Sequence, residues 1–366
     1  MTNSRLQLLA CGGAALFCFA TAPCRAIIFY ATGDPAHNTT APTGSVTNSG
    51  WQFQGQWGSF LGTVISSKHF VTAKHVGGTV GAPFVFNSVS YSTVSVTNDP
   101  NSDLSIWRIC GTFPLFAPIY TNSNEQGNSL VVFGRGTQRG AEVFVTNMLG
   151  NAELKGWQWG PYDGVQRWGE NQVADIINGD AIFGTVIGDL LTANFDQTGG
   201  ANECHLSVGD SGGAVFIREG STWKLAGINY AVDGPYNTTD SGNGFNAALF
   251  DEGGLYKQTS TTWVLTPDVP IDVPGSFYAT RISSHVAWIN SVLNAPAPPD
   301  SQPALQSSSD AAGAYTDNAS AVVDDVAKTI TIPIPLQPEF YRLRACSSSR
   351  IKTIALQGGN VVLTYE

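Results

Sequence analysis

The chain has 366 residues, of which 42% are hydrophobic and only 13% are charged, and its formal net charge is −10. Its acidity and the lack of any Lys and Arg cluster argue against a nucleic-acid partner, and its hydrophobic content argues against a disordered chain. The 40 Gly and 19 Pro, together with many Thr, Val and Phe, indicate a loop-rich β protein with one large domain and a small appendage.

The N-terminus has the pattern of an export signal. Arg5 precedes an apolar run over residues 6–22, and Ala26 offers a cleavage site, so we predict a signal peptide over residues 1–26. The protein is then secreted or extracytoplasmic, at the cell surface or in the periplasm. A stable membrane span is disfavoured because the run is short for a hydrocarbon core of about 30 Å. Lipidation at Cys11 is disfavoured because this cysteine lies inside the run.

The first candidate for chemistry follows a strand-like segment. Short β-branched or aromatic runs, such as residues 60–65, 84–89 and 130–133, predict antiparallel strands. The segment after the first of these runs ends in Thr-Ala-Lys-His-Val, which places His75 at the end of a strand, where a general base can be held. A lone histidine is more often a structural residue, so this motif depends on its companions.

The second candidate is an acid that leads into the next strand. Asp103 precedes the alternating apolar run Leu-Ser-Ile-Trp-Arg-Ile. A buried acid in this position can hold an imidazole in the tautomer that accepts a proton. Asp99 is the local competitor, but only Asp103 is followed by this strand pattern.

The third candidate is the sequence Gly-Asp-Ser-Gly-Gly over residues 209–213. A nucleophilic serine needs a sharp turn without side-chain bulk, so that its hydroxyl is exposed and backbone amides converge on the substrate oxyanion. The glycines around Ser211 meet that requirement. Taken alone, the motif also suits an ordinary glycine-rich hairpin turn.

The C-terminal third predicts a helix, a linker and a small module. Ile282, Val286, Ile289 and Leu293 form one apolar stripe, which predicts a helix over residues 280–293. Four prolines within nine residues predict a stiff linker over residues 295–304. We therefore divide the mature chain into a large domain (27–294), this linker and a β-rich module (305–366), whose strand-like runs are 329–334, 340–343, 351–356 and 361–365.

The mature chain keeps three cysteines, Cys110, Cys204 and Cys346. Three thiols cannot all pair internally, so one disulfide and one free thiol are the simplest expectation. We predict that Cys110 pairs with Cys204, because each lies seven residues from a proposed catalytic residue. The cysteines lack the close spacing of a zinc site, and we predict no metal site, although the sequence leaves calcium open.

The three motifs in the order His, Asp, Ser resemble the trypsin/chymotrypsin family of serine peptidases, which carries TAAHC, a DIALL-like run and GDSGG. The resemblance covers roughly residues 27–293. It implies an all-β fold of two antiparallel six-stranded β-barrels with a closing C-terminal helix. It also implies a serine endopeptidase that hydrolyses protein or peptide substrates through an acyl-enzyme intermediate, without a cofactor.

Carried over residue by residue, the resemblance makes His75 the general base and acid, Asp103 its orienting partner and Ser211 the nucleophile. The amides of Gly209 and Ser211 would form the oxyanion hole. The histidine motif departs from the family at Lys74 and Val76, which stand where Ala and Cys are usual. One family disulfide is therefore missing.

The resemblance also suggests where specificity arises. His205 stands six residues before the nucleophile, at the floor of the family's substrate pocket, and Tyr230 lies in the segment that resembles its substrate-binding strand. A protonated His205 would favour an acidic or polar side chain. An unusual segment with Trp157, Trp159 and Trp168 either shapes the cleft or simply packs.

Many family members activate when a freed N-terminal isoleucine pairs with the aspartate before the nucleophile. Cleavage after Ala26 would expose Ile27, and Asp210 is the matching acid. The alternative is that Ile27 and Ile28 begin an ordinary strand.

Two other functions compete with the peptidase. A catalytically silent protease-like domain would bind partners without turnover. An α/β-hydrolase esterase would need its acid and histidine after the serine, where His285 is the remaining histidine, and would need a parallel βα pattern that the β-rich sequence lacks. The C-terminal module could add a surface or carbohydrate contact.

Overall fold

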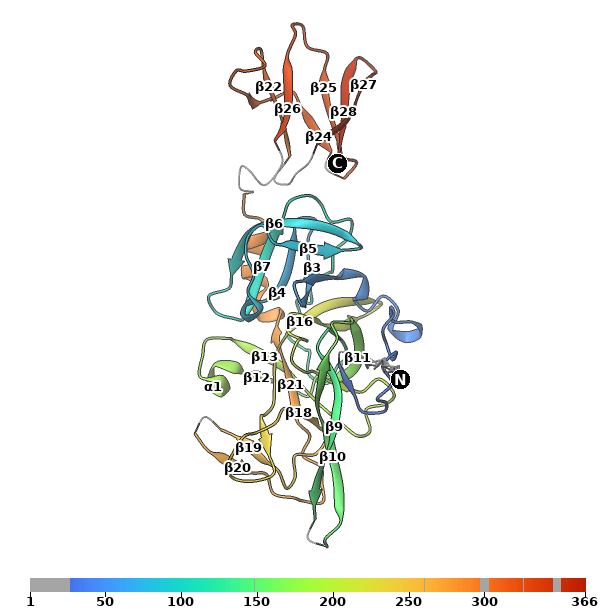
Figure 1. Ribbon diagram of the computed structural model, residues 1–366, viewed down its shortest axis with the longest axis vertical. Helices are drawn as coiled ribbons and strands as arrows, with labels where there is room; N and C mark the ends of the chain where they lie inside the picture. The colour runs from blue at the N-terminus through green and yellow to red at the C-terminus, as the bar shows by residue number, and fades with distance from the viewer. Residues whose placement is uncertain (1–26, 148, 260, 297–302, 325, 345–349) are drawn as a thin grey trace, which may run out of the picture.

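The computed structural model describes residues 27–147, 149–259, 261–296, 303–324, 326–344 and 350–366 (Figure 1). The predicted signal peptide and most of the predicted linker lie outside the described residues. The described chain is built mainly from antiparallel sheets, one of them a closed six-stranded barrel, with few helices. This confirms the predicted all-β class and is consistent with its chymotrypsin-like form. No helix in the described part is long and apolar enough to cross a membrane.

The first unit is a closed antiparallel barrel with the strand order β2-β3-β4-β7-β6-β5. Its strands are β2 (Gln54–Trp57), β3 (Phe60–Val64), β4 (His69–Ala73), β5 (Pro83–Phe86), β6 (Val89–Asn98) and β7 (Leu104–Ile109). Aromatic rings fill its interior, where Phe70 stacks on Phe84 with centroids 3.9 Å apart. The predicted run 84–89 is two strands, because Asn87 and Ser88 adopt positive φ and turn the chain into a tight hairpin.

The second unit is a seven-stranded sheet with the order β11-β8-β15-β16-β21-β13-β12. Its strands are β8 (Ser129–Gly134), β11 (Arg167–Gln172), β12 (Asp175–Asn178), β13 (Asp189–Asn194), β15 (Ala214–Glu219), β16 (Thr222–Val232) and β21 (Ser276–Arg281). Unlike the predicted second barrel, this sheet does not close through a continuous ladder. The short pair β1 (Ile28–Phe29) and β14 (Cys204–His205) lies beside its end, joined to β11 by the single bridge Glu170 to Glu203.

A long hairpin extends from the second unit and reaches the lower end of the molecule in Figure 1. It consists of β9 (Thr137–Thr146) and β10 (Ala152–Tyr162), with β18 (Ala247–Leu249) beside β10. Buried Lys155 anchors it, because its ammonium group pairs with Asp251 at 2.5 Å and Asp268 at 2.9 Å. A neighbouring sheet contains β17 (Tyr236–Asn237), β19 (Tyr256–Gln258) and β20 (Trp263–Leu265).

Two short α-helices complete the large domain. Helix α1 (Gly179–Phe183) begins after Asn178, whose side chain accepts a hydrogen bond from the Ala181 amide. Helix α2 (Val286–Leu293) closes the domain, as predicted, with Ile289 buried in the core. It starts later than the predicted residue 280, because β21 continues to Arg281 and the 3₁₀ turn η4 (Ser283–His285) follows. The other 3₁₀ turns are η1 (Gly44–Val46), η2 (Trp51–Phe53) and η3 (Lys74–Val76).

The C-terminal residues form two further sheets around a core of their own, made by Leu305, Ile330, Ile332, Leu363 and Tyr365. Among the described residues, no strand of these sheets pairs with the large domain. The strands are β22 (Ala304–Ser308), β23 (Thr316–Asp317), β24 (Val322–Asp324), β25 (Thr329–Pro333), β26 (Phe340–Arg344), β27 (Ile351–Gln357) and β28 (Asn360–Tyr365). The structure thus places β25 to β28 over the four predicted runs; the domain boundaries themselves stay predictions.

The predicted disulfide between Cys110 and Cys204 is wrong. Cys110 is disulfide-bonded, whereas Cys204 is a free, fully buried thiol. The two residues belong to different units, since Cys110 follows β7 of the barrel and Cys204 lies in β14. The Cys204 sulfur packs so closely on Gly169 that a Cβ there would stand 2.3 Å from it.

Candidate active site

His75 and Asp103 form a hydrogen-bonded pair at the end of the barrel. Strand β4 ends at Ala73, and the turn η3 carries His75, while Asp103 immediately precedes β7, the neighbour of β4. The Asp103 carboxylate accepts two hydrogen bonds from the same residue, one from His75 Nδ1 at 2.6 Å and one from its amide at 3.0 Å. Asp103 is buried and the His75 side chain is 39% exposed. The acid therefore fixes the orientation of the imidazole, and within the described chain no residue forms a hydrogen bond with the other ring nitrogen.

Lys74, which departs from the family pattern, ties these two segments together. Its amide donates to the Asp103 carbonyl at 2.7 Å, and its ammonium group donates to the Ser102 carbonyl at 2.6 Å and the Asp99 carbonyl at 3.1 Å. Asp99 itself pairs with His285 Nδ1 at 2.7 Å. The structure thus holds a second Asp–His pair that the sequence motifs did not reveal, and it brings Asp103, not Asp99, to His75.

Ser211 lies in a turn whose next two positions require glycine. Gly212 has φ of +74°, and a Cβ there would meet Thr72 Oγ1 at 2.2 Å, while a Cβ at Gly213 would meet the Phe133 carbonyl oxygen at 2.0 Å. Asn229 of β16 holds the turn, because its side-chain amide donates to the Phe133 carbonyl at 2.8 Å and the Asp210 carbonyl at 3.0 Å. The close contact of Gly212 with Thr72 brings the serine turn against β4, the strand that leads into the turn carrying His75.

Tyr230 connects the serine turn to the His75 ring from the other side. Its ring lies edge-on to His75 with centroids 5.8 Å apart, and it lines the same cavity as Ser211. No hydrogen bond joins the Ser211 hydroxyl to His75 within the described chain. In ligand-free enzymes such bonds are often long and tighten when substrate binds.

The amide of Ser211 itself and the amide of Gly209 donate no hydrogen bond within the described chain. The intervening Asp210 N–H, by contrast, donates to the Ser207 carbonyl. Gly209 adopts φ of +94°, in the region that glycine occupies without strain. A free amide on the nucleophilic residue itself and another two residues before it are the elements of an oxyanion site.

The Asp210 carboxylate is buried beneath this turn and holds it in place. It accepts hydrogen bonds from the Gly136 amide at 2.7 Å, the Ser207 amide at 2.8 Å and the Ser207 hydroxyl at 2.9 Å. Burial raises the pKa of Asp210 to about 7.

The structure places Ile28 in strand β1, paired with His205, which agrees with the alternative that the segment begins an ordinary strand. Activation by a freed Ile27 stays a prediction.

A cavity of about 210 Å³ opens beside Ser211. Its walls include the apolar side chains of Trp159, Leu206, Val208, Ala231 and Val232. Of the three tryptophans in the unusual segment, Trp159 thus lines the cleft and also packs against the hydrophobic cluster of Trp157. Trp168 packs in another hydrophobic cluster.

His205 does not line this cavity, which corrects its assignment to the pocket floor. Its ring is buried near Phe195 and Phe277, and its Nδ1 lies 2.7 Å from the Leu206 carbonyl oxygen. Burial lowers the pKa of His205, which favours the neutral ring. In strand β14 the His205 side chain points away from the cleft, and the next residue, Leu206, lines the cavity instead.

A buried acid beside this segment predicts a pH effect on stability. One Glu203 carboxylate oxygen accepts from the Asn171 side chain at 2.9 Å and the Asp196 amide at 3.0 Å, and burial raises the Glu203 pKa from 4.5 to about 8. The folded state therefore binds more protons than the unfolded state between these pH values, so stability falls as pH rises through this window. We expect Glu203→Gln to reduce this fall, because glutamine does not titrate. Its amide oxygen can still accept both hydrogen bonds, so the fold should be kept.

Thermal unfolding of both proteins between pH 4.5 and 8 measures the effect. Asp210, which also has a raised pKa, should retain part of the decline in the variant. Parallel melting-temperature curves for wild type and variant would contradict a raised Glu203 pKa.

The described residues contain no cluster of three or more His, Cys, Asp or Glu side chains that could hold a metal ion.

No protein-family model and no curated protein matches the chain. Solved structures that resemble it include neuropsin, a serine protease expressed in the limbic system of mouse brain, at 14% identity and a TM-score of 0.40, covering 68% of this chain and 96% of that one. Another is kallikrein-related peptidase 10 in complex with Zn²⁺, at 14% identity and a TM-score of 0.39, covering 69% and 98%.

Proposed function

We propose that the protein is a secreted serine endopeptidase that uses Ser211, His75 and Asp103. The observation that carries this proposal is the 2.6 Å hydrogen bond from His75 to buried Asp103, held against a glycine turn in which the amides of Gly209 and Ser211 are free. A structural Asp–His pair alone would not require a serine turn with free donors beside it.

The chemistry follows from these positions. The Ser211 hydroxyl attacks the substrate carbonyl carbon and passes its proton to His75 Nε2, while Asp103 stabilises the imidazolium. The Gly209 and Ser211 amides bind the oxyanion. His75 then gives the proton to the leaving amine as the peptide bond breaks. Water, activated by His75, hydrolyses the resulting acyl ester and restores the serine.

The rival function is a catalytically silent domain of the same fold that binds partners. A fluorophosphonate probe separates the two, because it reacts with an activated serine and spares ordinary ones. We expect the purified protein to be labelled at Ser211, located by peptide mass spectrometry, and Ser211→Ala to remain unlabelled. A correctly folded protein without labelling would favour the silent domain.

The lining of the cavity beside Ser211 predicts which side chain the enzyme prefers in the residue before the scissile bond. The apolar walls favour an apolar side chain over an acidic one, because a carboxylate would lose hydration and the ionisable side chain of the lining that lies closest to the serine, Asp210, is itself an acid. We expect kcat/KM to be at least about 100-fold higher for Leu or Val than for Glu at this position. A series of otherwise identical fluorogenic peptides tests this expectation, and faster cleavage after Glu as pH falls would support a protonated His205 instead.

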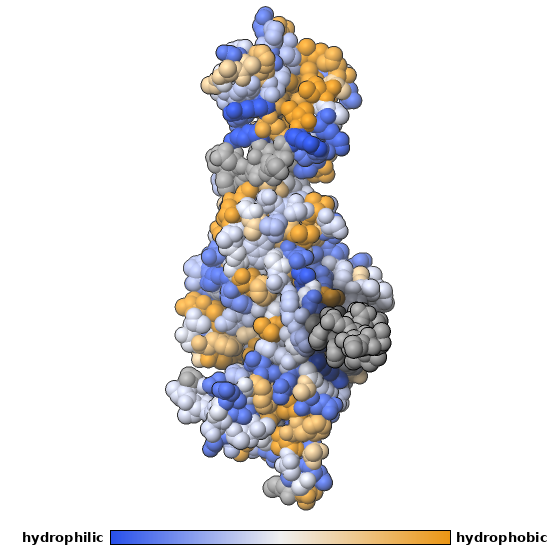
Figure 2. Space-filling view, in the orientation of Figure 1, coloured by the Kyte–Doolittle hydropathy of each residue, from blue (hydrophilic) through white to orange (hydrophobic). Residues whose placement is uncertain are grey.

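We also propose that the C-terminal module contacts a surface or carbohydrate outside the cell. Its edge strand β27 exposes Ile354 and Leu356, which are 66% and 73% accessible, and Figure 2 shows hydrophobic surface on this part of the molecule. Deleting residues 305–366 should then release the enzyme from the cell fraction without loss of peptide cleavage. An unchanged distribution would contradict the proposal.

A further inference from the structure

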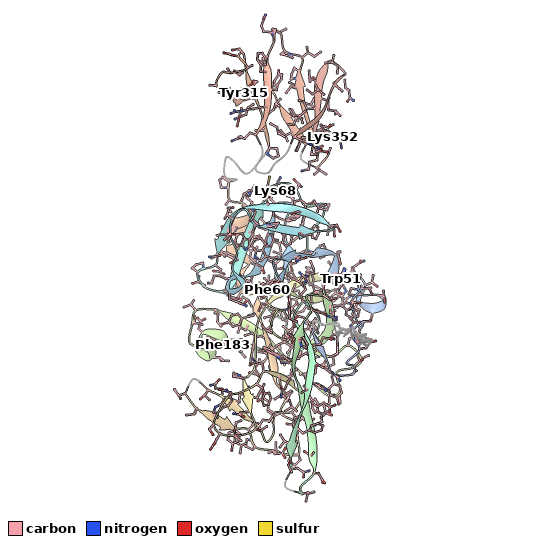
Figure 3. All side chains as sticks on the ribbon, in the orientation of Figure 1. Trp51, Phe60, Lys68, Phe183, Tyr315 and Lys352 are labelled. Carbon is pink, nitrogen blue, oxygen red and sulfur yellow. The ribbon has the colours of Figure 1, made fainter. Side chains whose placement is uncertain are left out.

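A second and larger cavity, of about 430 Å³, lies next to His75. Three segments of the barrel line it: the turn between β2 and β3, the residues that directly follow His75, and the start of β5. Figure 3 shows Phe60, one of the lining residues, at the end of the barrel that faces the second unit. Val76 and Gly77 belong to this lining and not to that of the cavity beside Ser211, so the two cavities adjoin His75 through different neighbours.

The walls of this cavity are held by specific contacts. The Trp57 indole donates to the Gly77 carbonyl at 2.9 Å, and Gly78 packs so closely on the same indole that a Cβ would lie 2.2 Å from it. In the turn between β2 and β3, the Ser59 carbonyl accepts a hydrogen bond from the Tyr162 hydroxyl at 2.6 Å. The Tyr162 ring also packs against Gly209, where a Cβ would stand 2.9 Å from it. The cavity is thus tied to the turn that carries the free amides.

The position of His75 between the two cavities assigns a direction to a bound peptide. The acyl part of a substrate must lie with the Ser211 turn, because the oxyanion amides are there. The leaving amine must lie on the other side of the reacting carbon, within reach of the His75 proton. Successive residues of an extended peptide advance by about 3.3 Å, so the first residues of the leaving segment reach the turn that follows His75.

We infer that this cavity binds a large apolar side chain in the first two residues of the leaving segment, an inference that rests on the proposed peptidase function. Trp57, Phe60, Val76, Pro83 and Val85 supply its apolar lining, and none of its lining residues is charged. An aromatic or large aliphatic side chain gains from leaving water here. The enzyme therefore selects substrates on both sides of the scissile bond.

The test uses quenched fluorescent peptides with one constant acyl segment and with Ala, Leu, Phe or Glu in the first two leaving positions. We expect kcat/KM to rise at least about 10-fold from Ala to Phe or Leu in one of these positions, and Glu to give no gain. Thr79→Trp should abolish the gain, since exposed Thr79 lines the cavity and a new indole would fill it. Thr97→Trp is the matched control, an exposed threonine of β6 outside the lining.

A small ester substrate with the same acyl segment but no leaving peptide separates this inference from the function on which it rests. Both tryptophan variants should hydrolyse the ester as wild type does. Equal peptide rates for Ala and Phe in an enzyme that cleaves the ester would overturn the cavity assignment and leave the peptidase intact. Loss of the gain in Thr97→Trp as well would also overturn it, and absence of ester cleavage together with absence of fluorophosphonate labelling would remove both.

Discussion

Replacement of Ser211 by alanine should lower kcat for peptide cleavage roughly a million-fold, with little change in KM. The variant loses the oxygen that forms the acyl ester, while the cavity of about 210 Å³ and the free amides of Gly209 and Ser211 remain to bind substrate. The turn should keep its shape, because its contacts are made by Asn229, Asp210 and the two glycines and not by the serine hydroxyl. Steady-state kinetics on one fluorogenic peptide, with thermal unfolding to verify the fold, measures the effect.

Ser221→Ala provides the control, since Ser221 is an exposed serine in the turn between β15 and β16, away from the cleft. It should retain full activity. If Ser211→Ala kept more than about a tenth of the wild-type rate, the measured cleavage would not depend on a serine nucleophile, and the proposed mechanism would fail.

The features that the sequence predicted best are those in which chemistry restricts the residue types within a short segment. The turn at residues 209–213 requires glycine at 212 and 213, because the Thr72 hydroxyl and the Phe133 carbonyl occupy the space of a Cβ. The segment after Asp103 forms β7, beside β4, the strand that leads into the turn carrying His75. Local pattern was enough in these segments because each is one strand or one turn.

Features built from distant segments were not predicted. Leu206, not His205, lines the cavity because the pairing of β14 with β1 decides which side chain faces the cleft. Tyr162 reaches Gly209 across a hairpin whose register contains bulges, which no spacing rule anticipates. The Asp99–His285 pair joins residues 186 positions apart, and its histidine lies in a segment without a motif.

Lys74 and Val76, which depart from the trypsin/chymotrypsin pattern, have structural roles of their own. Lys74 binds the carbonyls of Ser102 and Asp99 and so supports the loop that presents Asp103. Val76 packs against the barrel core where the family places a disulfide cysteine. Apolar contact and hydrogen bonds to the loop thus stabilise the turn that carries His75.

Asp103→Asn should lower kcat by about 10⁴-fold without unfolding the protein. The carboxylate of Asp103 accepts two hydrogen bonds from His75, whereas asparagine has only one acceptor oxygen. In the variant this oxygen accepts from the His75 amide, which now lies 3.0 Å from a carboxylate oxygen. The new NH₂ group then replaces the other carboxylate oxygen, which now lies 2.6 Å from His75 Nδ1. Nδ1 must accept a hydrogen bond, so the proton moves to Nε2, and the ring can no longer take the proton of Ser211.

Asp99→Asn makes the same chemical change at the other Asp–His pair, where His285 Nδ1 lies 2.7 Å from the carboxylate. This control should lower the melting temperature, because both residues are buried, but should leave kcat within a fewfold of wild type. Kinetics and thermal unfolding of both variants separate the roles of the two pairs. Equal losses of kcat would mean that Asp103 acts only by supporting the loop, and tautomer control of His75 would then be excluded.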